Sequence, residues 1–308
     1  MDRYPTSLIE FQARFGTEEA CAAYLIEQRW PDGFVCPVCG SVRAWRRKTL
    51  AHTFECAECG RQTSVRAGTI LHDSKLALTT WFLAAFLVAT HSNGLSARQL
   101  QRMLGLGSYR TAWMLAGKLR RAMVDPQRAP LSGLIEADES TLPLRTREDP
   151  PAGGGGRSLE GRMAIAGAVE SSDGVVGRRR LQAIDDYAAQ TLHAFLLKAI
   201  APGSEVKTDG WAGYPNAPGV VHDPHVVGKM AAHVVLPTIH TVFSNVKSGA
   251  KGIYHGLRRP HLQTCLDEFV FRFNRRHTPF AAFRSILPIA SSIKPVPYNM
   301  LIEPVSCA

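Results

Sequence analysis

The chain has 308 residues, a hydrophobic content of 45% and a formal net charge of +10 at pH 7. This length allows two or three domains, one with a sizeable core, and the composition is ordinary for a globular protein. The excess of basic residues favours nucleic acid as the partner over an anionic membrane surface. The start of the chain holds no apolar signal region, and the most apolar run, residues 76–90, is too short to span a bilayer. We therefore expect a cytoplasmic protein.

Four of the seven cysteines form two Cys-x-x-Cys pairs, and a glycine follows each pair. Sixteen residues separate the pairs, which is typical of a four-cysteine zinc ribbon, and each glycine supports a tight turn. A disulfide or a redox motif would be the alternative, but the duplication at this spacing disfavours both. The pattern predicts one structural Zn²⁺ held by Cys36, Cys39, Cys56 and Cys59.

Basic residues surround this predicted ribbon. Trp45 and Phe54 lie among them, an arrangement that favours contact with nucleic acid over a merely solvated surface. The basic residues are Arg43, Arg46, Arg47, Lys48, Arg61 and Arg66.

A helical segment follows the ribbon. We expect a buried helix capped by Ser74, then two helices within residues 95–123, broken at Gly105–Ser108. Helix, short glycine-containing turn and helix is the helix-turn-helix pattern, although ordinary helical bundles share it. The predicted inward positions are Leu100, Met103 and Leu104 in the first helix and Ala112, Leu115, Ala116 and Leu119 in the second, and Ser96 caps the first.

The charge of this helical segment is one-sided. From Ser74 to Val124 there is no Asp or Glu, whereas seven residues are Lys or Arg. Acid-free helices repel one another unless an anion lies against them, and the phosphate backbone of DNA is the natural candidate. We expect Arg98, Arg102, Arg110, Lys118 and Arg121 to bind DNA.

Two predicted strands after Pro130 each lead to an aspartate. The first, Leu134–Ser140, places Glu136 and Asp138 on one face, because side chains alternate along a strand. The second, Ser204–Gly210, delivers Asp209 where the strand stops. Two adjacent carboxylates make a site for hard divalent cations. Glu136 and Glu139 remain alternatives to Asp138 as the ligand.

The order of predicted elements in residues 131–280 indicates an RNase H-like α/β core. In that fold the first and fourth strands are neighbours, which by analogy brings Asp138 and Asp209 together. A polar loop containing Gly153–Gly156 follows the first strand, and Arg178–Arg180 on the third strand are expected to face a substrate. The remaining predicted elements are strands Arg162–Glu170 and Val175–Ile184, helix Tyr187–Ile200 capped by Asp185 or Asp186, a strand near Val220, and helices His240–Lys251 and Pro260–Asn274. In the last helix, Phe269 and Phe273 are expected in the core, with Arg272 and Arg276 at a basic edge.

Several motifs in order resemble one family, from about Phe11 to His277. The zinc-ribbon cysteines, Glu136-x-Asp138-Glu139, Thr208-Asp209-Gly210-Trp211-x-x-Tyr214, Lys251-Gly252-x-Tyr254-His255-Gly256 and the run Leu266–Arg276 together look like the zinc-ribbon DDE-type insertion-sequence transposases of the group numbered fifteen ninety-five. Thirty-five residues separate Asp209 from Asn245.

The resemblance implies a retroviral-integrase-like core that binds two Mg²⁺ or Mn²⁺ ions. Asp138 and Asp209 would be the first two ligands, and Asn245 would stand where the family's more familiar triad has Glu. The ions would activate the attacking oxygen and stabilise the leaving one as the element's ends are cut and joined to target DNA. His240, five residues before Asn245, lies close enough in sequence to sit near the site, and Lys247 and Lys251 are spaced to track a phosphate.

These features predict four segments and two functions. The segments are an N-terminal helix with a zinc ribbon (1–70), a helical DNA-binding module (71–130), the catalytic core (131–280) and a C-terminal tail (281–308). A DNA transposase, assembled as a homo-oligomer on double-stranded DNA in the bacterial nucleoid, is the first function. A non-catalytic zinc-ribbon DNA-binding protein is the second. Asp138 and Asp209 favour the first, whereas Asn245 leaves the second open.

Overall fold

The computed structural model describes residues 5–144, 158–172, 175–225, 232–254 and 257–302. The chain divides into two compact units, the first made of Met1–Asp125 with His277–Leu301 and the second of Pro126–Arg276 with Ile302–Ala308. The glycines predicted in the loop after the first core strand lie outside the described residues. No helix in the described ranges is both long and apolar enough to cross a membrane.

The first unit is a helical bundle with an aromatic core. Its helices are α1 (Leu8–Phe15), α2 (Glu18–Arg29), α3 (Leu78–Thr90), α4 (Ala97–Met103), α5 (Tyr109–Arg121) and α10 (Pro279–Ser292), and α11 (Tyr298–Ile302) ends at the unit boundary. The ring of Phe283 in α10 contacts Phe11, Phe15, Phe82 and Phe86. The segment expected to be a tail therefore contains a helix whose buried face, with Ile286 and Leu287, completes this core.

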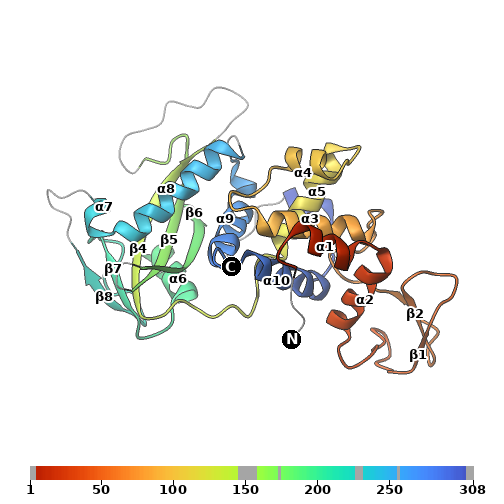
Figure 1. Cartoon of the computed structure of the whole chain (residues 1–308). Coiled ribbons are helices and arrows are strands. Elements are labelled where there is room, and N and C mark those ends of the chain that lie inside the picture. Colours follow the sequence, from red (N-terminus) through yellow and green to blue (C-terminus); the bar gives the residue numbers. More distant parts are fainter. Residues whose placement is uncertain (1–4, 145–157, 173–174, 226–231, 255–256, 303–308) are drawn as a thin grey trace. The chain divides into compact units, whose positions relative to one another are not determined.

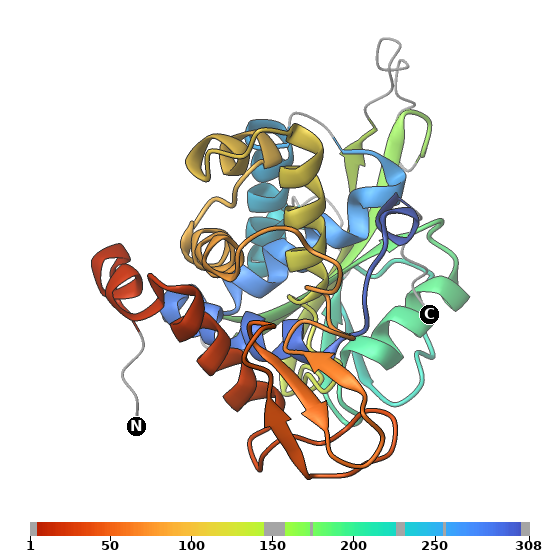
Figure 2. The same cartoon turned by 90° about the vertical axis from the view of Figure 1, so that its right-hand side faces the viewer.

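A small three-stranded sheet belongs to the same unit (Figure 2, orange). Its antiparallel strands are β1 (Ala44–Arg46), β2 (Thr53–Cys56) and β3 (Gln62–Ser64). Phe54 stacks on Phe34 with 5.0 Å between ring centroids, and Trp30 packs against Phe34. Phe54, which the sequence placed among nucleic-acid contacts, is thus part of a miniature core, whereas Trp45 is 50% exposed.

The helix–turn–helix segment forms as predicted, with two corrections. Ser96 and Gln99 make a reciprocal capping box at the start of α4, and Gly105 takes a left-handed φ of 61° in the turn. The predicted inward positions of α5 are buried, but Met103 of α4 is 48% exposed. Ser74 does not cap α3, which begins at Leu78, because its hydroxyl instead accepts a hydrogen bond from Trp81 Nε1.

The second unit is built on a five-stranded sheet with the order β6-β5-β4-β7-β8. Strand β4 pairs antiparallel with β5 and parallel with β7, and β7 pairs parallel with β8. The strands are β4 (Leu134–Pro143), β5 (Arg162–Ser172), β6 (Val175–Ile184), β7 (Glu205–Thr208) and β8 (Val221–Pro224). Three antiparallel strands followed by a parallel neighbour of the first confirm the RNase H-like α/β core predicted from the sequence.

Helices cover both faces of this sheet (Figure 1). Helix α6 (Ala189–Ala199) packs on the face that carries Ile135 and Ala137 of β4. Helices α8 (Pro237–Gly252) and α9 (Arg259–Phe273) pack on the opposite face, and the short helix α7 (Ala232–Val235) precedes α8. The alternation of β4 therefore sends Glu136 and Asp138 toward α8.

The three consecutive arginines of β6 do not face a substrate, contrary to expectation. Arg178 forms an ion pair with Glu170 at 2.5 Å, and Arg180 donates to the carbonyl of Ala129. Arg179 is fully buried, with its guanidinium 4.4 Å from the ring centroid of Phe269 and also against Phe273. Burial, together with two neighbouring arginines, lowers its pKa. Arg179 therefore packs β6 against aromatic residues of α9, whereas Arg178 and Arg180 bind groups on β5 and before β4.

The position of Arg272 in α9 also differs from the prediction. Arg272, expected at a basic edge, is only 8% exposed, and its Nε lies 3.4 Å from the fully buried Glu268 Oε1. Asn274 exchanges hydrogen bonds with the backbone N–H and C=O of Arg179, which fixes the end of α9 on β6. The charged residues of this motif therefore stabilise the fold.

Candidate functional site

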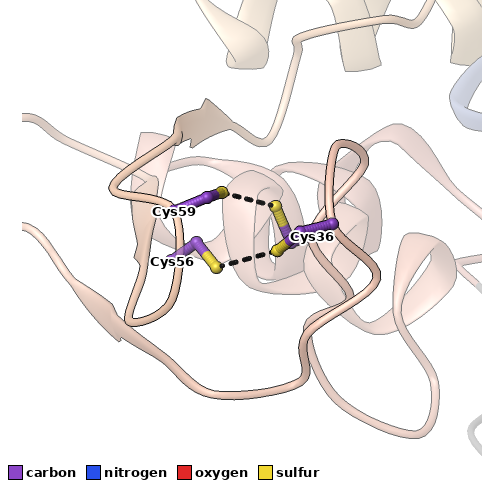
Figure 3. A group of neighbouring side chains, drawn as sticks. Cys36, Cys56 and Cys59 are labelled. Atoms are coloured by element: carbon purple, nitrogen blue, oxygen red, sulfur yellow. Dashed lines mark hydrogen bonds between the residues drawn. The ribbon is translucent and has the colours of Figure 1, made fainter.

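The four cysteines of the ribbon converge on one point (Figure 3). The sulfur of Cys36 lies 3.6 Å from that of Cys59, and the sulfur of Cys39 lies 3.5 Å from that of Cys56. All four sulfurs lie within 4.8 Å of one another, as a tetrahedral ion requires. The predicted zinc ligands are therefore together in space, and the chemistry of four thiolates fits Zn²⁺.

Backbone groups prepare these sulfurs for a metal. Gly40 and Gly60 take φ values of 71° and 67°, which complete the two knuckles. The N–H groups of Cys59 and then Glu58 point at the sulfur of Cys56 and lower its pKa to about 6. Because the thiolate is the species that binds metal, this geometry favours the ligand form of Cys56 near neutral pH. A fully protein-ligated site of this kind is structural.

The acidic site begins with the pairing of β4 and β7. Their parallel register runs from Leu134 opposite Glu205 to Glu136 opposite Lys207. Asp138 lies two residues after Glu136, and Asp209 lies two residues after Lys207. The structure therefore brings Asp138, in the middle of β4, level with Asp209, which directly follows the end of β7. Asp138 is only 5% exposed.

Tyr214 marks where the carboxylates converge. Its side chain is fully buried. Burial raises its pKa, and the charges of Glu139, Asp138 and Asp209 raise it further. Because side chains alternate along β4, Glu139 lies on the face of the sheet opposite Asp138. The sequence contains this tyrosine in a motif, but nothing in its local pattern reveals the role.

The turn after β7 places Tyr214. Gly210 has a φ of 80°, and the N–H of Trp211 donates to Asp209 Oδ1 at 3.0 Å. A Cβ on Gly213 would lie 2.8 Å from Leu192 of α6, so only glycine allows this turn to approach the helix. These constraints fix the orientation of Asp209 and Tyr214 together.

Helix α8 approaches the sheet closely beside Asp138. Gly167 of β5 stands opposite Asp138 in the register, and a Cβ there would lie 2.8 Å from Phe243 and 2.9 Å from Ile239. Glu136 Oε2 accepts a buried hydrogen bond of 2.9 Å from the N–H of Ile239. A carboxylate at a helix N-terminus is electrostatically favourable. Glu136, an alternative ligand in the sequence analysis, is therefore engaged in anchoring α8.

This anchored helix brings His240 to the acidic site. His240 Nε2 lies 3.4 Å from Asp138 Oδ2, and the histidine side chain is 30% exposed. Asn245, the predicted third ligand, is an exposed residue of the same helix. Five residues turn a helix by roughly 140° beyond one full turn. His240 and Asn245 consequently leave α8 on different sides.

The donor set of this site fits a divalent ion. Carboxylate oxygens suit Mg²⁺ and Mn²⁺, and carboxylates repel one another when no cation lies between them. Among the described residues, the cysteines form the one group of three or more His, Cys, Asp or Glu whose ligand atoms all lie within 4.8 Å. The ligand atoms of Asp138, Asp209 and His240 therefore do not all lie within that distance of one another.

The predicted DNA-binding residues fall into two classes. Arg98, Arg102 and Arg110 are exposed on α4 and α5, as are Lys247 and Lys251 on α8. Lys118 and Arg121 are half-buried: Lys118 lies 6.0 Å from the ring of Trp81, and Arg121 donates to the carbonyl of Met300. Within the exposed class, Arg98 lies over the ring of Tyr109 and Arg110 over that of Tyr298.

Two family models match this chain. Residues 130–274 match the ISXO2-like transposase domain, and residues 16–62 match the transposase zinc-ribbon domain. These two regions of the chain are therefore similar to the two domains of such transposases. The family resemblance inferred from the motifs is confirmed.

A curated relative agrees with this assignment. An uncharacterized protein in transposable element ISH50 of Halobacterium salinarum is 32% identical over 163 residues. The match covers 49% of this chain and 52% of the relative, so the chain spans about half the length of the curated relative.

Removal of zinc is expected to unfold the ribbon of this chain. Binding energy at such a site is folding energy, so Cys56→Ser should abolish the one zinc per chain and melt the ribbon. Metal analysis of purified protein and thermal unfolding measure both effects. Cys265→Ala, at a buried cysteine of the other unit, is the matched control and should retain zinc. Full zinc content in Cys56→Ser would contradict the assignment.

The transposase domain should lose stability at alkaline pH through Tyr214. Its pKa is raised in the folded state, so the unfolded chain ionises first, near the ordinary tyrosine pKa of about 10. The contribution of protonated Tyr214 to the free energy of unfolding is complete below that pH and declines as the pH rises above it. The free energy of unfolding should therefore fall between about pH 8 and about pH 10.5 by more in the parent than in Tyr214→Phe. Urea unfolding of both proteins measures the difference, and Tyr109→Phe, at an exposed tyrosine, should behave like the parent.

Proposed function

We propose that the protein is a DNA transposase that binds the terminal inverted repeats of its insertion sequence, cleaves at the ends and joins the 3′-hydroxyl to target DNA. The observation that supports this proposal is the parallel pairing of β4 with β7, which brings Asp209, just after the end of β7, level with Asp138 of β4. It lies within the segment matched to the transposase domain.

In this mechanism the side chains would hold and orient divalent ions. Asp138 and Asp209 would supply oxygen ligands. Mg²⁺ or Mn²⁺, when bound, would supply an activated attacking oxygen and stabilise the leaving one. Two ions are expected from the family resemblance. The resemblance also implies Asn245 as a third ligand, but this residue is exposed and leaves α8 on a different side from the residue beside Asp138, which disfavours that role.

DNA binding is proposed for the exposed basic residues. Arg98, Arg102 and Arg110 stand on the two helices of the helix-turn-helix pattern, within a segment that contains no acid. Lys247 and Lys251 are four residues apart on α8 and share one side of it. We also propose double-stranded DNA as the substrate, a homo-oligomer on the ends, and action in the cytoplasm.

A non-catalytic DNA-binding protein is the alternative function. It is favoured by the neutral side chain of Asn245 where a third carboxylate would strengthen metal binding. The two functions differ in whether divalent metal and the aspartates are needed for strand cleavage.

Loss of either aspartate is expected to abolish cleavage and joining. Asp138→Ala and Asp209→Ala should each lower the rate by more than about a hundredfold, because even groups that only orient metal ligands contribute ten- to a hundredfold. A cleavage assay on terminal inverted repeats with Mg²⁺ or Mn²⁺ measures this, and DNA binding should be unchanged. Asp185→Asn, at an exposed acid before α6, is the control. Full activity in both alanine variants would favour the non-catalytic function.

Replacing Arg98, Arg102 and Arg110 by Ala is expected to weaken end binding and flatten its salt dependence. Each phosphate that the protein no longer neutralises should reduce the slope of log affinity against log salt by about 0.9. Fluorescence anisotropy across a salt series measures both quantities. Arg284→Ala, at an exposed arginine of α10, provides the control. An unchanged slope in the triple variant would place the DNA-binding surface elsewhere.

A further inference from the structure

We propose that His240 is the third protein ligand of the divalent-metal site. The inference rests on the proposed function and concerns which residue completes the site with Asp138 and Asp209. The sequence directs attention to Asn245 for this role, whereas the structure brings a different residue of α8 to Asp138.

The distance between His240 and Asp138 suits a shared ion. Nε2 and Oδ2 are 3.4 Å apart, longer than the 2.7–2.9 Å of a good charged hydrogen bond. Two donor atoms each about 2.1 Å from one ion lie roughly 3.0–3.4 Å apart at octahedral or tetrahedral angles. The observed spacing lies at the upper end of this range.

The position of His240 is set by its neighbours. The preceding residue, Ile239, donates its N–H to buried Glu136 and packs on Gly167, and Thr238 Oγ1 lies 3.2 Å from Ser171 Oγ. The first turn of α8 is therefore held to β4 and β5 by three separate contacts. A side chain on such an element has little freedom, and pre-positioned ligands bind metal without an ordering cost.

Exposure is consistent with a ligand at the edge of the site. The Asp138 side chain is 7% exposed, whereas that of His240 is 30% exposed. A metal ion between them would touch a buried carboxylate on one side and remain open to a DNA phosphate on the other. Asn245, on another side of α8, is exposed to solvent.

A nitrogen ligand has a measurable consequence. Mg²⁺ prefers oxygen donors, whereas imidazole suits later first-row metals, and Mn²⁺ accepts mixed ligand sets. With His240 as a ligand, the site should prefer Mn²⁺ to Mg²⁺. A carboxylate at position 240 should reverse much of that preference, because it adds an oxygen donor and a negative charge.

The experiment measures metal binding to the full chain, with its zinc in place, by titration calorimetry with Mg²⁺ or Mn²⁺ alone. We expect His240→Ala to weaken Mn²⁺ binding at least tenfold and Mg²⁺ binding less. His240→Glu should restore binding and shift the ratio of Mn²⁺ to Mg²⁺ affinity toward Mg²⁺ about tenfold. Asn245→Ala should bind both metals as the parent does. His240→Gln, of similar size, replaces His240→Ala if the latter does not fold.

Two outcomes overturn the inference. One is Mn²⁺ affinity in His240→Ala equal to that of the parent while Asp209→Ala loses binding, which leaves the proposed function standing with another third ligand. The other is a loss of binding in Asn245→Ala with none in His240→Ala, which returns the role to Asn245. If Asp138→Ala and Asp209→Ala also bind Mn²⁺ as the parent does, the metal site of the proposed function fails as well.

Discussion

The parallel pairing of β4 with β7 is the constraint on which the transposase domain depends. Parallel strands cannot be joined by a tight turn, so the chain must pass through β5, β6 and α6 before β7 reaches the edge of β4. The result brings Asp138 of β4 level with Asp209, which follows β7 and is separated from Asp138 by seventy residues of sequence. Neighbouring carboxylates repel each other, and a bound cation would relieve that repulsion. The pairing of these two strands is therefore the feature on which the proposed metal site rests.

Gly167 determines how closely α8 approaches the sheet beside Asp138. Because Gly167 has no side chain, α8 lies directly against β5 opposite Asp138. Glu136 then fixes the helix start through a hydrogen bond to Ile239. Glu136 and Asp138, two residues apart on β4, consequently have different roles. Glu136 anchors α8, and Asp138 faces His240 of that helix. Burial alone does not separate them, because both are at most 6% exposed.

Features fixed by local spacing could be predicted from the sequence. The two cysteine pairs, the capping of α4 by Ser96 and the order of the core strands depend on residues close in the chain, and each agrees with the structure. Features that depend on distant packing could not. Arg179 is covered by Phe269 and Phe273, about ninety residues later, and Phe283 of α10 packs among the first helices of the chain. Nothing in the neighbourhood of these residues reveals their partners.

The family and the position of α8 are both predicted from the sequence, yet they do not decide which residue of α8 lies at the acidic site. The sequence predicts a helix near residue 245 and places it beside the aspartates, and α8 fulfils that prediction. Which side chain enters the site depends on the rotation of the helix about its axis, since each residue turns it by about 100°. That rotation is set by Glu136, Gly167 and Ser171 on the sheet, far away in sequence. With the first turn of α8 held there, His240 faces Asp138, and a residue five positions later points to another side.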